Sequence, residues 1–228
     1  MENMYLSLIG DIVGSRKINF REELQAKLEN ALSKVNSDYK ASIESKFLIT
    51  VGDEFQGLLK PTVSVYKIIC SIAEAIYPVQ VRFGLGLGRI TTPVKEEALG
   101  MDGPAFYAAR EALKDAHKKK EHAIVFKSEL NVLDREIEEA INVMLGSLAV
   151  IKKLWPESFY KILPHLRKGK SQKEIASLIE TTQPYISKLV NNAYWKEVEL
   201  LEEQVERLLS FYLSSNSFYN HKGYKSYI

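Results

Sequence analysis

The segment "KFLITVGDEFQGLL" (46–59) decides the fold, because it places two apolar runs on either side of a Gly-Asp pair. The runs 46–51 and 54–59 have the β-branched and aromatic composition of strands. Gly52-Asp53 reverses the favoured Asp-Gly order of a two-residue turn, but the strand pattern on both sides still predicts a tight hairpin.

Extended and helical periodicities alternate around this hairpin. The run 4–11 is a short, apolar, partly β-branched strand that ends at Asp11. The segment 19–39 spaces its apolar residues as a helix does, and Asn19 is its expected N-cap. After the hairpin, the pattern predicts a helix, a strand, a helix and a strand over 62–77, 78–90, 103–118 and 122–127.

The predicted order of elements is β-α-β-β-α-β, followed by one more helix and strand. This order predicts an α/β protein whose core over residues 1–127 is an α+β, ferredoxin-like βαββαβ domain. In that topology the end of the first strand and the turn of the hairpin meet at one edge of the sheet. Asp11 and Asp53 are therefore expected to converge.

Two converging carboxylates favour a bound cation, because their charges repel each other. Mg²⁺, or Mn²⁺ in its place, fits, since Mg²⁺ takes one or two carboxylates and completes its shell with water and phosphates. Gly14 and Ser15 leave backbone N–H groups free to approach a triphosphate, and Arg16 adds a positive charge. The alternative is that each Asp simply forms an ordinary turn.

Four motifs resemble the core of the class III nucleotide cyclases. They are, in order, "GDIVGSR", "VGDEF", "VRFGLGLGRI" and "MDGPAFYAAR". The hairpin also resembles the Gly-Gly-Asp-Glu-Phe turn of diguanylate cyclases. The cyclase likeness covers about 4–127, whereas nearly the whole chain is similar to the SatD family, small bacterial proteins with such an N-terminal region and a DNA-binding-like C-terminal segment.

The cyclase resemblance implies roles for five positions of this sequence. Asp11 and Asp53 would bind two metal ions, and the carbonyl of Ile12 would be a further ligand. Glu54 would assist them. Arg110 would be the catalytic residue that steadies the transferring phosphate.

Two departures from the cyclase pattern favour nucleotide binding without turnover. Phe106 stands where the cyclases carry an Asn that holds the ribose and the transition state, and Ile49 stands where a polar residue contacts the purine. Losing such positioning groups costs several factors of ten in rate. The "GLGLG" run (84–88) lacks the third glycine of a dinucleotide-binding loop, so that interpretation is rejected.

The second half of the chain is helical throughout. We expect a connecting helix over 128–157, a helix-turn-helix domain over 158–213 and a polar tail over 214–228. The segment 197–213 has near-heptad apolar spacing, with Val198, Leu201, Val205 and Leu208, and is either a homodimer helix or a cover for the preceding three helices.

"QKEIASLIETTQPYISKLV" (172–190) resembles the helix-turn-helix of bacterial regulators. Its small core is expected to contain Ala176, Leu178 or Ile179, Ile186 and Leu189. Candidate DNA-binding residues are polar or basic: Gln183, Tyr185, Ser187, Lys188 and Asn191 on the last helix, with Lys168 and Lys170 for phosphates. The alternative is a packing module whose polar helix is merely solvated.

Composition restricts the classes of function. The formal net charge of +2 shows no bias of the whole protein toward nucleic acid. Cys70 is the only cysteine, so no intrachain disulfide can form. No segment has the pattern of a signal peptide or a membrane span, which predicts a cytoplasmic protein without a membrane partner. The four histidines, His117 among them, show no metal-ligand spacing and are expected to be packing or surface residues.

These observations support three functional hypotheses. The first is a DNA-binding regulator that responds to a nucleotide and Mg²⁺ through its cyclase-like domain. The alternative is an active metal-dependent purine nucleotidyl cyclase, or a related phosphotransferase, whose helical half controls or oligomerises it. In the third hypothesis both sites are relics and the chain is an interaction protein.

Overall fold

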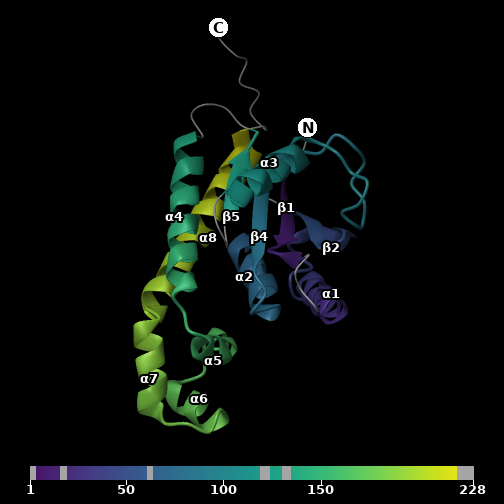
Figure 1. Cartoon of the computed structure of the whole chain (residues 1–228). Coiled ribbons are helices and arrows are strands. Elements are labelled where there is room, and N and C mark those ends of the chain that lie inside the picture. Colours follow the sequence, from purple (N-terminus) through teal and green to yellow (C-terminus); the bar gives the residue numbers. More distant parts are fainter. Residues whose placement is uncertain (1–3, 16–19, 61–63, 119–123, 130–134, 220–228) are drawn as a thin grey trace. The chain divides into compact units, whose positions relative to one another are not determined.

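The chain folds into two compact units, which Figure 1 draws in a computed structural model. The first unit comprises Met1–Gly146 and Val205–Ile228, and the second Ser147–Gln204. The structure describes residues 4–15, 20–60, 64–118, 124–129 and 135–219, without the side chains of 214–219.

The first unit is built on one five-stranded sheet. Its strands are β1 (Met4–Ile12), β2 (Ile43–Val51), β3 (Glu54–Leu59), β4 (Val81–Arg89) and β5 (Ile124–Ser128). Their order in the sheet is β2-β3-β1-β4-β5. The central strand β1 is antiparallel to both of its neighbours, and β5 is parallel to β4. The predicted hairpin and its flanking strands are therefore present in a mixed α/β unit.

Helices cover both faces of this sheet (Figure 1). The helices α1 (Arg21–Asp38) and α2 (Val65–Ala75) pack against each other on one face, and α3 (Pro104–Lys118) covers the other. The helix α1 begins at Arg21, with Phe20 at the N-cap position and no side-chain cap. The expected cap, Asn19, lies outside the described residues.

Aromatic rings fill the sheet face under α1 and α2. Phe55 and Phe83 meet edge to face, with ring centroids 6.0 Å apart, and both are buried. A Cβ atom at Gly10 would lie 2.1 Å from the ring of Phe55. Glycine at this position therefore makes room for the aromatic pair, which anchors the centre of the sheet.

Both outer strands are bonded by side chains from neighbouring helices. On β2, the Asn36 amide of α1 accepts from the backbone N–H of Phe47 at 2.8 Å and donates to its carbonyl at 2.9 Å. On β5, Asn142 makes the same pair of bonds with Phe126, at 2.8 and 2.9 Å. A loop also pairs with β2, because Lys46 bonds through its backbone to Glu96 and Ala98.

The rest of the chain is helical, with α4 (Arg135–Lys153), α5 (Glu157–Arg167), α6 (Gln172–Leu178), α7 (Gln183–Asn192) and α8 (Trp195–Tyr219). The helix α8 continues to Tyr219, so the expected polar tail from 214 was wrong over its first six residues, 214–219. The remainder of that tail lies outside the described residues. In the part of the chain that the structure describes, no helix combines the length and hydrophobicity needed to cross a bilayer.

An aromatic cluster forms the core of the second unit. The rings of Trp155 and Phe159 lie 4.6 Å apart, and each lies 6.1 Å from the ring of Trp195. Of the two alternatives for one core position, Leu178 is 54% exposed and Ile179 is partly buried, while Ile175, which was not expected there, is buried. In the short helix α6, Ile175 and Ala176 form the face that packs inward.

The helix α8 carries two largely buried carboxylates one turn apart. Glu202 lies in the second unit, where it pairs with Lys152 at 2.6 Å and with Arg167. Burial opposes its ionisation, but the hydrogen bond from Arg167 and the neighbouring positive charges lower its pKa. Glu206 lies in the first unit and accepts the backbone N–H groups of Tyr66 and Lys67 at 3.0 and 3.2 Å. It thus caps α2, whose own N-cap side chain makes no such bond.

The buried face of α8 differs from the expected heptad. Val198 and Val205 are buried, as are Leu209 and Tyr212, whereas Leu201 and Leu208 are only partly buried. The ring of Tyr212 meets Phe126 of β5 edge to face at 5.8 Å. The apolar face of α8 is therefore buried within its own chain, but from Val205 onward the helix belongs to the first unit and contacts β5 and α2, whereas the expected cover was for the three preceding helices.

Candidate functional site

Three charged residues stand in one row across the sheet. Glu54 of β3 is the direct cross-strand partner of Asp11 on β1, and Arg82 of β4 is the partner of Asp11 on the other side. Directly opposed residues in a sheet point to the same face. The register of the strands therefore brings two acids and one base together.

The helix α3 lies very close to this face of the sheet. A Cβ atom on Gly84, Gly86 or Gly88 would lie only 2.1 to 2.6 Å from backbone atoms of α3. The contacting turns carry the small residues Ala105 and Ala109. The "GLGLG" run is therefore a surface against which a helix packs, and this close approach brings the charged side chains of α3 to the row of charges.

Two side chains of α3 contact the acids of the row. Arg110 forms an ion pair with Glu54. His117, two turns further along, places Nε2 at 3.2 Å from Oδ2 of Asp11. Arg82 approaches the same oxygen at 3.6 Å through NH1. The result is a mixed cluster, Asp11, Glu54, Arg82, Arg110 and His117, which we call the strand-end cluster.

The environment of Asp11 disfavours its negative charge. Burial, which leaves 19% of the side chain exposed, is the main cause that raises its pKa, and the charge of Asp53 is the next. The charges of His117 and Arg82 lower this pKa, but not enough to cancel the other effects. A further positive charge beside Asp11 and Asp53 would therefore be favourable.

The available donor atoms decide whether a metal ion could be held by protein side chains alone or only together with a phosphate ligand. Within the described residues, no three His, Cys, Asp or Glu side chains are arranged so that they could hold a metal ion. Two carboxylates and a backbone carbonyl are nevertheless hard oxygen donors, and Mg²⁺ often binds through one or two carboxylates with water and substrate phosphates. The residues fit Mg²⁺ with a phosphate ligand better than they fit a closed protein-only metal site.

The residues that follow β1 form a turn. Ile12 is buried, and Gly14 has a positive φ of 71° with open space around its α-carbon. Ser15 is partly buried, and Arg16 lies outside the described residues. A Cβ would strain the turn at Gly14, so glycine there is required by the backbone.

Comparison with known proteins identifies the family. The family model described as "SatD family" matches residues 5–197. The chain belongs to the SatD family. No protein of curated function matched the sequence.

Several solved structures similar to this SatD-family chain are cyclase domains. A bacterial light-regulated adenylyl cyclase is 14% identical over 55% of this chain and 76% of its own, with a TM-score of 0.42. The guanylate cyclase domain of RhGC from Catenaria anguillulae, in complex with GTP, is 15% identical over 55% and 78%, with a TM-score of 0.42. The guanylyl cyclase domain of RhoGC from Blastocladiella emersonii is 17% identical over 55% and 81%, at 0.39. Scores of this size carry no argument about activity.

Phe106 and Ile49, the two positions of this SatD-family chain that differ from the cyclase pattern, both carry apolar side chains. Phe106 is 8% exposed and packs with Leu58, Ala98 and Met101. Ile49 is the cross-strand partner of Phe55, which faces away from α3. Neither side chain can hydrogen-bond a nucleotide, and Phe106 is a core residue.

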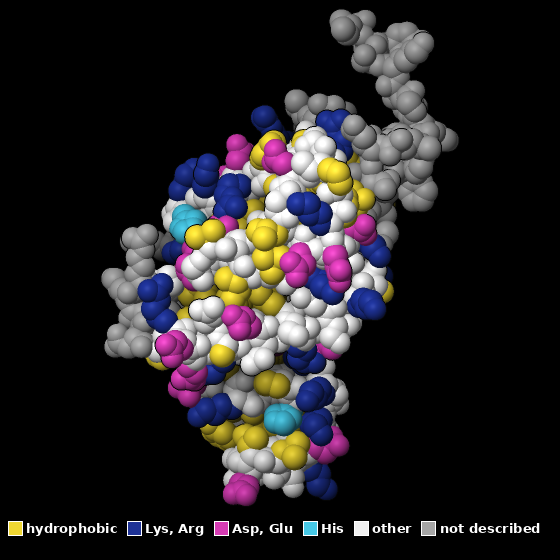
Figure 2. Space-filling view, turned by 90° about the vertical axis from the view of Figure 1, so that its right-hand side faces the viewer, with side chains coloured by type: hydrophobic (Ala, Val, Ile, Leu, Met, Phe, Trp, Pro, Cys, Tyr) yellow, Lys and Arg dark blue, Asp and Glu magenta, His cyan; other side chains and the backbone are white. Residues whose placement is uncertain are grey.

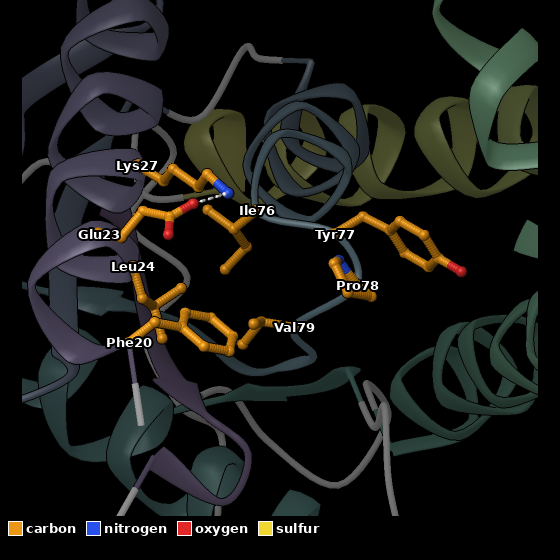
Figure 3. Close-up of a pocket in the computed structure, with 8 residues that line it drawn as sticks. All are labelled: Phe20, Glu23, Leu24, Lys27, Ile76, Tyr77, Pro78 and Val79. Carbon is orange, nitrogen blue, oxygen red and sulfur yellow. Dashed lines mark ion pairs between the residues drawn. The ribbon is translucent and has the colours of Figure 1, made fainter. Parts of the chain in front are cut away.

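A shallow pocket lies elsewhere on the first unit of this SatD-family chain, between the first turns of α1 and the segment that precedes β4 (Figure 3). Its volume is about 150 Å³. Phe20, Leu24, Ile76 and Val79 line it, and a Glu23–Lys27 ion pair of 2.7 Å stands at one side. Ligand sites usually reach about 300 Å³ or more, so this pocket is small for an organic ligand.

The second unit places the predicted DNA-binding residues on and near α7. Ile186, Leu189 and Val190 are buried, so the opposite side of α7 faces solvent. Exposed residues there and at the end of α5 are Gln183, Tyr185, Lys188, Asn191 and Lys168, while Ser187 and Lys170 are partly buried. The Gln183 amide donates to Gln172 of α6 at 3.0 Å.

Charged side chains of both signs are interspersed over the face drawn in Figure 2. This agrees with the small net charge of the SatD-family chain. A basic surface for nucleic acid would therefore have to be local.

Sequence reasoning missed two members of the strand-end cluster, Arg82 and His117. The side chain of His117 is 48% exposed, as expected of a surface or half-buried residue, but its contact with Asp11 was not anticipated. Identifying Arg82 would have required the register of β1 with β4, which the sequence alone does not determine. His117 follows Arg110 by two helical turns, so it lies on the same side of α3.

Proposed function

We propose that the first unit is a ferredoxin-like, cyclase-like domain that binds a nucleoside triphosphate with Mg²⁺ or Mn²⁺ beside Asp11 and Asp53. The observation that carries this proposal is the strand-end cluster, where acids from two strands meet bases from β4 and α3. A metal–triphosphate complex needs both acidic and basic side chains, because the acids favour the cation and the bases favour the phosphates.

Each residue would have a simple role. Asp11, Asp53 and the carbonyl of Ile12 would hold the ion, and Glu54 would keep Arg110 close to the phosphates. The backbone N–H groups of Gly14 and Ser15, with Arg16, would approach the triphosphate. The ion would neutralise phosphate charge when bound.

Binding rather than turnover is the proposed activity. The buried Phe106 cannot provide the hydrogen bonds that the matching Asn provides in the cyclases, and Ile49 cannot contact a base edge. Incubation with ATP or GTP and Mg²⁺ or Mn²⁺ is expected to give little or no cyclic product by chromatography. Clear turnover would instead establish the alternative, a metal-dependent purine nucleotidyl cyclase.

A thermal-shift panel of nucleotides with and without Mg²⁺ tests the binding. A ligand that binds only the folded protein raises the midpoint, by an amount set by its concentration relative to Kd. The double variant Asp11→Asn, Asp53→Asn should fold and lose the metal-dependent shift. Asp38→Asn, which removes an exposed ion pair with Lys34 on α1, is the matched control and should keep it. No shift in the wild-type protein with any nucleotide would refute the proposal.

A second function, DNA binding by the second unit, is favoured by α7. We propose that α6 and α7 form a helix-turn-helix in which the solvent side of α7 enters the major groove. The support is the division of α7 between a buried apolar side and an exposed side with Gln183, Lys188 and Asn191. A homodimer would present two such helices to paired half-sites. The competing hypothesis is a packing module.

Fluorescence anisotropy with random duplexes at several salt concentrations separates these hypotheses. Alanine at Lys168, Lys170 or Lys188 should weaken binding to every sequence and reduce the salt slope by about 0.9 for each phosphate that is no longer neutralised. Gln183→Ala should relax base discrimination by about 1–3 kcal/mol for each base that Gln183 hydrogen-bonds. Lys161→Ala, on α5 beside its partner Glu157, is the control. Absence of binding at low salt would favour the packing module.

A further inference from the structure

His117 has one contact on each ring nitrogen, and the two contacts together fix its tautomer. Nδ1 lies 3.4 Å from NH1 of Arg82, and Nε2 lies 3.2 Å from Oδ2 of Asp11. A guanidinium group can only donate, so Nδ1 must accept and the proton must be on Nε2. The bonds therefore run in one direction, from Arg82 to His117 and from His117 to Asp11.

This chain of bonds uses only one oxygen of Asp11. Within the described residues, the ion-pair contacts of Asp11 all fall on Oδ2. Oδ1 is therefore the oxygen left for another ligand. A carboxylate that binds metal generally has its other interactions fixed by neighbouring groups, which set its orientation.

We propose that His117 is a positioning residue, which holds Asp11 by Oδ2 so that Oδ1 is presented to the cation. The inference rests on the proposed metal–nucleotide site and adds a residue to it. Arg82 acts one step further away, because its NH1, 3.4 Å from Nδ1 of His117, leaves Nε2 as the nitrogen that donates to Asp11.

Manganese titration of the full chain tests the role of His117. With Mn²⁺ alone as the probe, followed by electron paramagnetic resonance, His117→Leu should lower the affinity about tenfold or more, the usual loss when such a supporting group is removed. His117→Gln should stay within about threefold, because its amide can place a donor near the position of Nε2. Lys118→Met, which breaks a pair with Asp115 on the same helix, should not change the affinity.

The outcomes separate this inference from the proposed function. If the wild-type protein binds no Mn²⁺, either alone or together with ATP or GTP, the proposed site fails and the inference fails with it. If the wild-type protein binds but His117→Leu binds equally well, only the inference is overturned. Equal losses in the Leu and Gln variants would also overturn it, because a donor would then not be what matters. His117 is 48% exposed, so neither variant should unfold the protein.

A nuclear magnetic resonance measurement tests the geometry without any metal. Long-range ¹H–¹⁵N spectra distinguish the two imidazole tautomers, and His117 should show the proton on Nε2 in the wild-type protein. Arg82→Met should weaken that preference, whereas Arg89→Met, on the same strand but paired with Glu129, should not. A proton on Nδ1 of His117 in the wild-type protein would overturn the inference.

Discussion

Replacing Gly86 with alanine should force α3 away from the sheet. The new Cβ would lie 2.1 Å from the backbone nitrogen of Ala109 and 2.2 Å from the carbonyl oxygen of Ala105. Ordinary contacts of a Cβ begin at 3.4 Å, so restoring one would separate the two elements by 1.3 Å, the difference between 3.4 and 2.1 Å. Backbone atoms of a helix cannot turn aside as a side chain can, which puts the cost at the upper end of overpacking, about 2–3 kcal/mol.

Urea unfolding measures this cost in each unit separately. Both tryptophans, Trp155 and Trp195, lie in the second unit, so their fluorescence follows that unit, whereas far-ultraviolet circular dichroism follows the whole chain. Gly86→Ala should destabilise the first unit and leave the tryptophan transition unchanged. Gly146→Ala is the control, since a Cβ there meets nothing within 4 Å, and it should stabilise α4 by about 0.5–1 kcal/mol. If Gly86→Ala stays within about 0.5 kcal/mol of the wild-type protein, the close-packing explanation is wrong.

Three further substitutions test buried groups. Glu202→Gln should cost about 3–5 kcal/mol in the tryptophan-detected transition, because it leaves two cations without their carboxylate, while the exposed Glu203→Gln should cost almost nothing. Burial raises the pKa of Glu206 in the folded protein. Its contribution to stability should therefore fall as the pH rises from the usual carboxyl pKa through the raised value. In urea unfolding at a series of pH values, Glu206→Gln should remove this decrease in the free energy of unfolding. Phe106→Asn, which restores the cyclase-type residue, should lower the free energy of unfolding by about 3 kcal/mol or more by circular dichroism and should yield no cyclic product, whereas a stable and active variant would contradict its core role.

The elements of the first unit could be predicted because their periodicities are local. The runs on either side of Gly52-Asp53 became β2 and β3. The partners of Asp11 could not be predicted, because they depend on the register of β1 with β4. The sequence of one strand does not determine which residue of the neighbouring strand lies opposite a given position.

The glycines of β4 show a different limit. The missing third glycine was reason enough to reject a dinucleotide loop at 84–88, but it left these glycines without an alternative role. Their spacing of two puts Gly84, Gly86 and Gly88 on one face of a strand. A stripe of that kind predicts a helix packed close to the strand, and Ala105 and Ala109 at one-turn spacing in the next helix complete the pattern. The sequence therefore did contain a signal for this close packing, but the signal was divided between β4 and α3.

The asparagine contacts on the outer strands have a consequence for solubility. A free strand edge can pair with the same edge of another molecule, which is how sheets grow into aggregates. Asn36 and Asn142 satisfy the backbone of β2 and β5 at the middle of each strand, as a neighbouring strand would, but they offer no further edge. Intermolecular sheet growth would first have to break these bonds. A variant that lacks the amide of Asn36 or of Asn142 should therefore become prone to aggregation before it loses its fold.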